Sequence, residues 1–365
     1  MRMGLVIYGE LGMSSGGFLY DRFLVDALKS AGDTVDVISI PWPSWPAGVA
    51  RGFDSALLSR LRAWDGDLLL QDELAHPTLV TVNRRLRHGR RGGRRPVPIV
   101  SIVHHLKQSE RQGAVARAAV RRVERGYLDS VDAFIFNSRT TRRVVAGVIG
   151  REPAGVVASP GGDRLGDSAT EADVEARSGS PGPLRILFAG SFIPRKGLHV
   201  LLEALSVLPR GTWHLTAAGS RTADPGYARR LDRLVASHRL TDHVDFPGHL
   251  DEPALAAALR AHHVLAMPSS YEGFGIIYLE AMGFGVVPIA SRAGGGAEIV
   301  VDGRSGFLVR PESPTEITRI LGSLSADRNR LRAAAVGALE RSRYFPTWQA
   351  SMAAAVSFLH TFRRG

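Results

Sequence analysis

A chain of 365 residues is long for one average domain and suits two domains of ordinary size, and its 44% apolar and 22% charged residues are typical of a globular protein. The absence of cysteine excludes disulfides, thiolate metal sites and a thiol nucleophile, and the lack of a run of about 18 to 20 apolar residues argues against a membrane span. The apolar run at the start is too short for a signal peptide, so we expect a cytoplasmic protein, with an unusual net charge of +11.

Short runs rich in Val, Ile and Leu predict the strands of the first half, and an amphipathic segment at 17–32 predicts a helix after the first strand. These predicted strands are 3–8, 35–40, 68–70, 97–103, 133–136 and 156–158.

A glycine-rich loop, "YGELGMSSGG", links the first predicted strand to the first predicted helix. Gly16 and Gly17 allow close approach of the backbone to a ligand, and a helix that begins here would offer N–H groups to an anion. The spacing matches neither G-x-G-x-x-G nor a P-loop, so a plain structural turn stays open.

The segment "WDGDLLLQDE" contains Asp65 and Asp67 in a D-x-D spacing that is found in some metal sites. Because the pair leads directly into a predicted strand, as "GDTVDVIS" also does, we interpret it as the start of that strand. We therefore predict no metal site.

The excess positive charge is concentrated in two places. The run 84–95, "RRLRHGRRGGRR", holds seven arginines and no acid, and 111–127 places five more arginines on a predicted helix. Such clusters indicate a nucleic-acid or anionic-membrane surface, and a solvated loop and helix face is the alternative.

The polar stretch 161–183 is rich in Gly, Ser and Pro and predicts a linker, after which the pattern restarts. The strands of the second half are "LRILFAG", "WHLTAAG", "HVDFPG", "HVLAMPS", "VVPIAS" and "GFLV", with helices near 197–208, 226–239, 252–262, 275–284 and 313–342. Continuous apolar strands that alternate with helices are typical of parallel sheets covered on both faces, so the predicted fold class is α/β, with two doubly wound domains facing each other. Ligands of such sheets bind at the carboxyl ends of the strands, here in the interdomain cleft.

Two cations, Arg195 and Lys196, precede a predicted helix in "AGSFIPRKGLHVLLEAL". The helix dipole disfavours positive charge at this end, so the pair is explained by a bound polyanion. Each cation within about 4 Å of a phosphate contributes on the order of 4 kcal/mol, against about 0 to 1 kcal/mol for an exposed ion pair. A solvated basic loop is the alternative.

The stretch "SSYEGFGIIYLEAMGFGVVPIAS" holds Glu272 in a loop and Glu280 inside a helix that we predict to begin near Ile276. Each carboxylate can accept hydrogen bonds from a pair of hydroxyls, and the helix N-terminus offers amides to an anion. A ligand with a diol at each end and a diphosphate between them satisfies all three groups, and a nucleotide-sugar is such a ligand.

The same stretch, "EGFGIIYLEAMGFGVVPIAS", resembles the E-x7-E signature of the retaining glycosyltransferases of family 4. "GSFIPRKG" looks like the phosphate-binding segment of that family, and "GGAEIVVDGRSGFLV" resembles the stretch that follows the signature. The likeness covers the second half densely and the first half loosely, through "SIVHHL" and "FNSRTTRRVV". It implies the GT-B fold, two Rossmann-like domains facing a central cleft.

The resemblance implies a role for each matching residue. Glu280 would bind the ribose and Glu272 the sugar, while Arg195 and Lys196 would neutralise the departing diphosphate. His104 matches the histidine of the N-terminal domain, although His105 stands where the family more often has Asp, so either ring could face the sugar. The remaining predicted donor-binding residues are Gly16, Gly17, Gly190, Gly248, Gly273, Phe274, Gly275 and Ile276.

The resemblance also implies domains at 1–165 for the acceptor and 184–344 for the nucleotide-sugar, joined by a linker at 166–183. A terminal helix at 345–365 would cross back to the first domain, with Trp348 packed at the crossing.

The implied reaction is transfer with retention, by front-face attack of the acceptor hydroxyl on a UDP- or GDP-linked sugar, with neither metal nor other cofactor. The acceptor stays open between a lipid on an anionic membrane, to which each basic residue adds about 1 kcal/mol of attraction, and a soluble small molecule. A GT-B epimerase or phosphorylase would share the same cleft, and a non-catalytic nucleic-acid-binding protein would use the basic clusters. Only three lysines are available for a phosphorylase, and the glutamate pair argues against nucleic-acid binding, so we expect no nucleic-acid partner.

Overall fold

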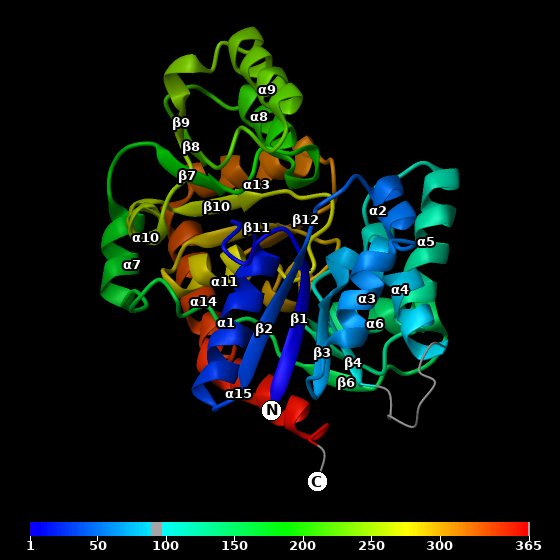
Figure 1. The fold of residues 1–365 in the computed structure, drawn as a ribbon. Coiled ribbons are helices and arrows are strands. Elements are labelled where there is room, and N and C mark those ends of the chain that lie inside the picture. Colours follow the sequence, from blue (N-terminus) through cyan, green and yellow to red (C-terminus); the bar gives the residue numbers. More distant parts are fainter. Residues whose placement is uncertain (89–96, 364–365) are drawn as a thin grey trace. The chain divides into compact units, whose positions relative to one another are not determined.

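The computed structural model describes residues 1–88 and 97–363 (Figure 1). The arginine-rich run 84–95 therefore lies largely outside the described residues. The chain forms two compact units, the first made of Met1–Pro160 and Trp348–Gly365 and the second of Gly161–Thr347.

The first unit is built on a sheet that, within the described residues, has six strands in the order β2-β1-β3-β4-β5-β6, all parallel. The apolar side chains of the inner strands β1, β3, β4 and β5 are buried because helices cover both faces, whereas the edge strands β2 and β6 are partly exposed. All six coincide with predicted strands, with bounds shifted by two residues at most. The strands are β1 (Arg2–Tyr8), β2 (Thr34–Ile40), β3 (Leu68–Asp72), β4 (Ile99–Val103), β5 (Ala133–Phe136) and β6 (Gly155–Val157).

Helices α1 (Gly16–Ser30) and α15 (Trp348–His360) pack together in the first unit (Figure 1). Phe23 of α1 stacks on Trp348 with ring centroids 4.1 Å apart, which attaches the C-terminal helix to this unit. The other helices are α2 (Trp45–Arg51), α3 (Ser55–Ala63), α4 (His76–His88), α5 (Ala114–Leu128) and α6 (Arg139–Ile149), with 3₁₀ turns at Glu73–Ala75 and Lys107–Ser109.

The second unit repeats the design, with a parallel sheet in the order β12-β11-β10-β7-β8-β9. The order reverses between β10 and β7, the place where ligands of doubly wound sheets bind. The strands are β7 (Leu184–Ala189), β8 (Trp213–Ala218), β9 (Val244–Gly248), β10 (Val264–Met267), β11 (Val287–Ser291) and β12 (Phe307–Val309).

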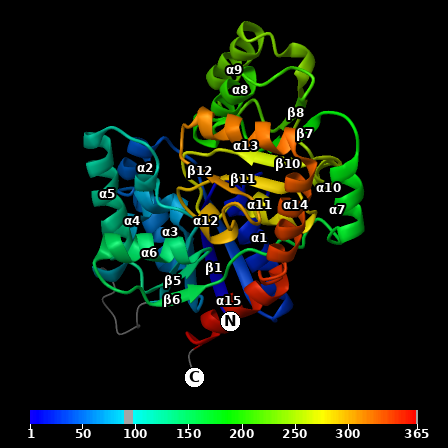
Figure 2. The same ribbon diagram turned by 180° about the vertical axis from the view of Figure 1, so that it is seen from behind.

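Helices cover both faces of this second sheet (Figure 2). On one face lie α8 (Leu198–Ser206), α9 (Pro225–Ser237) and α13 (Pro314–Ala326); on the other lie α10 (Glu252–Ala261), α11 (Ile276–Gly283) and α14 (Arg328–Ser342). A short helix, α12 (Gly296–Ile299), and the 3₁₀ turns Pro194–Lys196 and Thr241–His243 complete the unit. Across residues 1–88 and 97–363, no helix combines the length and the apolar character needed to span a bilayer.

Two sequence expectations need correction. The stretch 166–183, predicted as a linker, contains helix α7 (Glu171–Gly179), which packs on α14. Its N-terminus has a capping box between Thr170 and Asp173, a local signal that composition alone hides. The predicted helix 313–342 is two helices, because Asp327 has an extended backbone and its side chain caps α14 by accepting from the amide of Arg330.

Candidate functional site

Two loops of the second unit meet at the carboxyl ends of β7 and β10. The first loop carries Arg195 and Lys196 in the 3₁₀ turn after β7, and it ends at Gly197 with a φ of +75°. A Cβ on Gly197 would lie 2.3 Å from the carbonyl oxygen of Pro268, so only glycine permits this approach. The amide of Ser270 donates to the carbonyl of Arg195 at 2.8 Å, which fixes the two loops against each other.

Glu272, on the second loop, faces both cations. Its Oε1 lies 2.7 Å from Nζ of Lys196 and 3.6 Å from Nη1 of Arg195. Ser269 Oγ donates to the same oxygen at 2.7 Å, and Arg195 Nη1 also donates to the carbonyl of Tyr271 at 3.0 Å. Two cations face one carboxylate, so this cluster has an excess of positive charge.

The electrostatics of this cluster are set by burial and by the two cations. Burial acts to raise the pKa of Glu272, but Lys196 and Arg195 outweigh it and lower that pKa to about 2. Burial lowers the pKa of Lys196, although Glu272 acts to raise it. Arg195 contributes to lowering both pKa values, because it attracts the carboxylate of Glu272 and repels the ammonium group of Lys196. An additional anion bound beside the two cations would therefore stabilise the cluster.

Helix α11 begins directly after this loop. Gly275, at φ +96°, precedes the helix, which begins at Ile276 as predicted. The amide of Gly295 donates to the carbonyl of Glu272 at 2.8 Å, and a Cβ on Gly294 would lie 1.9 Å from that oxygen. The glycines thus hold the backbone of Glu272 beside the N-terminus of α11, the end that attracts anions.

Glu280 lies farther along α11 and is 1% exposed. Its carboxylate is held by Arg164, whose Nε lies 2.5 Å from Oε1 and whose Nη2 lies 3.3 Å from Oε2. Nη1 of Arg164 also binds Glu252 at 2.8 Å. Burial raises the pKa of Glu280, and Arg164 acts against that rise. Glu280 thus forms a buried ion pair with Arg164, which is separate from the ion pairs of Glu272.

Two of the other predicted glycines end strands at the same edge of the second sheet. Gly190 follows β7, and a Cβ there would lie 3.7 Å from Cδ of Lys196. Gly248 ends β9 at φ +85°, and its carbonyl accepts from the amide of Gly219 at 2.8 Å. Gly273 and Phe274 lie in the loop before α11, and the side chain of Phe274 is buried against Phe345, with centroids 6.2 Å apart.

In the first unit, Gly16 and Gly17 form the first turn of α1, next to His104. A Cβ on Gly17 would lie 3.1 Å from Cδ2 of His104. Nε2 of His104 lies 3.2 Å from Oδ1 of Asp21, whereas Nε2 of His105 lies 3.0 Å from Oε1 of Glu110. The two neighbouring rings therefore have different partners.

The sequence matches a known family. The model of the family "Glycosyl transferases group 1" matches residues 171–338. A GDP-mannose-dependent alpha-(1-6)-phosphatidylinositol monomannoside mannosyltransferase of Mycolicibacterium smegmatis is 33% identical over 274 residues, which cover 71% of this chain and 68% of the relative. The chain belongs to the group 1 glycosyltransferases.

Further relatives of this glycosyltransferase include a D-inositol 3-phosphate glycosyltransferase of Streptomyces bingchenggensis, 30% identical over 73% of this chain and 62% of the relative. A glycogen synthase of Mycobacterium tuberculosis is 27% identical over 74% of this chain and 64% of the relative. The chain thus spans about two thirds of the length of these curated relatives.

Solved structures establish the fold of the glycosyltransferase as GT-B. The sucrose-phosphate synthase of Thermosynechococcus elongatus has a TM-score of 0.80 and 23% identity, covering 99% of this chain and 98% of the other. Anabaena HepE, in complex with UDP and glucose, has a TM-score of 0.74 and 18% identity, covering 99% and 100%. The predicted family resemblance and the predicted GT-B fold are confirmed.

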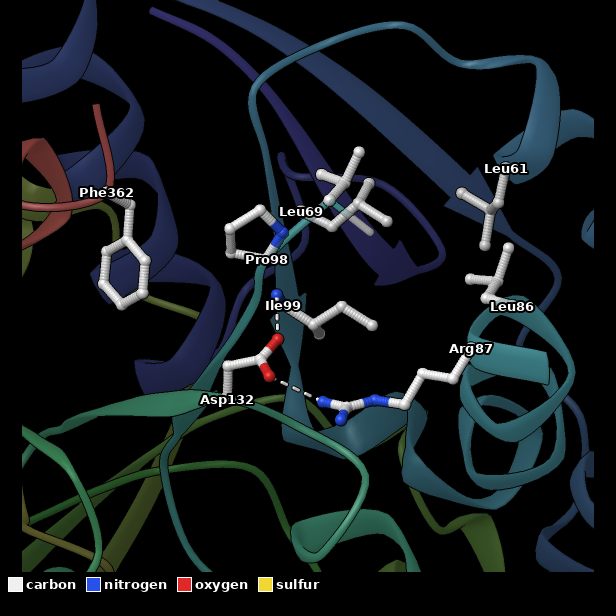
Figure 3. Close-up of a pocket in the computed structure, with 9 residues that line it drawn as sticks. Leu61, Leu69, Leu86, Arg87, Pro98, Ile99, Asp132 and Phe362 are labelled. Atoms are coloured by element: carbon white, nitrogen blue, oxygen red, sulfur yellow. Dashed lines mark hydrogen bonds and ion pairs between the residues drawn. The ribbon is translucent and has the colours of Figure 1, made fainter. Parts of the chain in front are cut away.

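The first unit contains a cavity of about 330 Å³ (Figure 3). It opens at the amino ends of β3 and β4, beside Leu69 and Ile99, with Phe362 also in its wall. Arg87 pairs with Asp132 at 2.7 Å on its lining. The lining residues that the structure describes include none of the predicted site residues, and this end of a parallel sheet is not where its ligands bind.

Asp65 and Asp67 of the D-x-D pair precede β3, as interpreted from the sequence. Asp65 Oδ1 lies 2.5 Å from Nη1 of Arg2, and Asp67 accepts from the amide of Arg2 at 2.8 Å. Both carboxylates thus attach the start of β3 to β1.

Sequence reasoning about the glycosyltransferase missed two groups of residues. Arg164, in "GGDRLG", was treated as part of a linker. The available signal for a functional role was a single arginine in a short segment flanked by glycines. Asp72 ends a strand in "LLLQDE" and Glu73 directly follows it, at the edge of a parallel sheet where ligands bind.

Proposed function

We propose that this chain is a retaining glycosyltransferase that moves a sugar from a UDP- or GDP-linked donor to an acceptor hydroxyl. The observation that carries the proposal is the cluster of Arg195, Lys196 and Glu272 beside the N-terminus of α11. Two fixed cations and a helix N-terminus converge where the sheet order reverses, and a carboxylate lies 2.7 Å from one of the cations. We assign the donor to the second unit and the acceptor to the first.

The diphosphate of the donor is the additional anion that would stabilise this cluster. Arg195 and Lys196 would bind its oxygens, with the amides from Phe274 to Ile276 at the start of α11. Glu272 stays ionised because its pKa is about 2, so it can accept hydrogen bonds from the sugar hydroxyls. The name of the Mycolicibacterium relative gives GDP-mannose as its donor, and the HepE structure contains UDP, which supports a donor of this class.

The nucleoside end of the donor would bind at Glu280, as the family resemblance implies. Glu280 is already paired with Arg164, so its carboxylate is held in a fixed orientation in a buried place. Ribose hydroxyls would then share Glu280 with Arg164. Gly248, whose φ of +85° favours glycine, would border the base.

The chemical step follows from these charges. As the bond between the anomeric carbon and the diphosphate breaks, negative charge grows on the phosphate, and Arg195 and Lys196 stabilise it without reorganising. The acceptor hydroxyl attacks from the same face and passes its proton to the departing phosphate, which gives retention. The positive field for this step comes from these side chains, so we propose that it needs no metal ion. Gly16, Gly17 and His104 are the residues of the first unit that we place at the transferred sugar.

For the acceptor we propose a lipid-linked molecule at an anionic membrane. Helix α5 supports this because its first turns, residues 114–119, are exposed and include Val115 at 86% exposure. Arg117 is exposed within these turns, and the exposed Arg121 and Arg122 follow on the same helix. Exposed apolar and basic side chains together favour the surface of an anionic bilayer. The name of the Mycolicibacterium relative contains phosphatidylinositol monomannoside, a lipid, whereas the name of the Streptomyces relative contains D-inositol 3-phosphate.

Product analysis tests the reaction class. The protein is incubated with UDP- and GDP-linked hexoses and a mixed lipid and inositol acceptor pool, and the anomeric configuration of the product is read by NMR. We expect the product to keep the configuration of the donor sugar, and Glu272→Gln to fold normally yet lose transfer. A product of inverted configuration contradicts the proposed mechanism.

A further inference from the structure

Three buried side chains of the first unit converge from separate parts of the chain. Asp21 lies on α1, Asp72 ends β3, and His104 follows β4. Each offers one potential ligand atom, and these atoms all lie within 4.8 Å of one another. Helix α1 and the carboxyl ends of the adjacent strands β3 and β4 thus bring two carboxylates and an imidazole close together.

This point has an excess of buried negative charge. Asp21, Asp72 and Glu73 are 0%, 2% and 3% exposed. Glu73 Oε2 accepts from the amide of His104 at 2.7 Å, and Asp72 Oδ1 accepts from the amide of Leu74 at 2.9 Å. Three carboxylates therefore surround one imidazole, and buried charges that lack an opposite charge cost free energy.

The carboxylate of Asp21 is incompletely bonded. Its Oδ1 lies 3.2 Å from Nε2 of His104, a long contact for a charge-assisted hydrogen bond. Its Oδ2 is buried and has no hydrogen-bond partner among the residues that the structure describes. A buried carboxylate oxygen without a donor is rare in folded proteins and calls for a ligand.

The geometry points to a divalent-cation site formed by Asp21, Asp72 and His104. Ligands at about 2.0 to 2.2 Å from one ion lie up to about 4 Å apart, so a small contraction of the recorded spacing completes the site. Two carboxylate oxygens and one imidazole nitrogen suit Mn²⁺ or Zn²⁺ better than Mg²⁺ or Ca²⁺, which prefer oxygen ligands alone. The ion supplies the positive charge that this cluster lacks.

The proposed ion has a defined consequence for His104. The ring lies against Gly17 and meets the edge of Tyr20 with centroids 5.4 Å apart. A metal ion on Nε2 would fix the ring plane, so His104 would present only its other nitrogen and its ring edge to a substrate. All three side chains belong to the first unit, and metal binding can be measured directly, so the test of this site needs no transfer assay.

The test is direct titration of metal into the full chain after treatment with a chelator. Mn²⁺ is followed by electron paramagnetic resonance and Zn²⁺ by calorimetry. We expect one ion per chain, and a rise in Tm when the ion is added. Asp72→Asn should weaken binding at least about 10-fold, since losing even an outer-shell partner of a ligand costs about 10- to 100-fold.

Asp65→Asn is the matched control, because it removes the same charge from an exposed carboxylate of the same unit. It should bind the metal as the wild type does. If Asp72→Asn does not fold, His104→Gln takes its place, and Co²⁺ absorption should lose the signature of a nitrogen ligand. Failure of the wild type to bind Mn²⁺ or Zn²⁺ at about 1 mM, the range of weak metal sites, overturns the proposal, and so does equal binding by Asp72→Asn and Asp65→Asn.

Discussion

The two units place opposite charge at the same position of the same kind of sheet. At the carboxyl ends of β7 and β10, Arg195 and Lys196 outnumber Glu272. At the carboxyl ends of β3 and β4, Asp72 and Glu73, with Asp21 of α1, outnumber His104. A Rossmann-like sheet therefore does not determine the charge of its ligand; the loops after the strands do.

The two clusters also differ in the ligands that they can bind. The cation-rich cluster of the second unit suits a diphosphate, because each of its positive charges can face a phosphate oxygen. The acid-rich cluster of the first unit repels phosphate and suits a cation.

Loss of one cation from the second cluster should have the largest effect. We expect Lys196→Ala to lower kcat/KM about 10²- to 10³-fold, because one preorganised charge no longer stabilises the departing diphosphate. Steady-state kinetics with the preferred nucleotide-sugar measures it. Lys29→Ala removes an exposed lysine of α1 and should match the wild type; equal loss in both variants would show that the effect is not local.

Arg164→Ala should come next, because it leaves Glu280 buried without a partner. We expect a loss of about 3 kcal/mol in the free energy of unfolding, together with a higher KM for the donor. Urea denaturation and kinetics measure the two effects. The double variant Arg164→Ala, Glu280→Gln should recover part of the stability, while Arg229→Ala, on the exposed face of α9, should change neither quantity. No recovery in the double variant would contradict a direct pairing.

The ionisation of Glu272 gives a prediction about pH. Its pKa in the folded state is about 2, below its ordinary value, so its ion pairs contribute stability above about pH 4.5 and lose it as the pH falls toward 2. We expect the wild type to exceed Glu272→Gln by about 2 to 3 kcal/mol at pH 7, and by much less at pH 3. Denaturation at both pH values measures this. A constant difference across that range would mean that Glu272 is not held ionised by Lys196 and Arg195.

The smallest expected effect concerns the surface of α5. Arg121→Glu and Arg122→Glu should each weaken binding to anionic vesicles by at least about 1 kcal/mol, the contribution of one basic residue near such a surface. Co-sedimentation at low and high salt measures it, with Arg229→Glu of the second unit as control. If the wild type does not bind vesicles at low salt, the soluble acceptor becomes the better proposal.

The sequence predicted the second unit more fully than the first, for a physical reason. Arg195 and Lys196 are adjacent, and Glu272 and Glu280 lie in one loop and helix, so both groups are visible as local patterns. The cluster of Asp21, Asp72 and His104 is assembled from three distant segments by the pairing of β3 with β4, and no local pattern announces it. The partner of Glu280 was hidden in the same way, because Arg164 precedes it by 116 residues.

Secondary structure was likewise predicted where the sequence shows a local apolar pattern and missed where it does not. Strands were predicted well because continuous Val, Ile and Leu runs need burial on both faces. The helix α7 and the break at Asp327 were missed, since each depends on a single capping side chain rather than on a pattern of apolar residues.

The central claim is that the cation-rich cluster of the second unit binds the diphosphate of a nucleotide-sugar. Calorimetric titration of UDP and GDP into the wild type, Lys196→Ala and Lys29→Ala tests it without any acceptor. The account predicts that one of the two nucleotides binds the wild type and Lys29→Ala alike and binds Lys196→Ala at least about 10-fold more weakly, the equivalent of about 1.4 kcal/mol. Equal affinity of Lys196→Ala and the wild type, or no binding of either nucleotide, would contradict it.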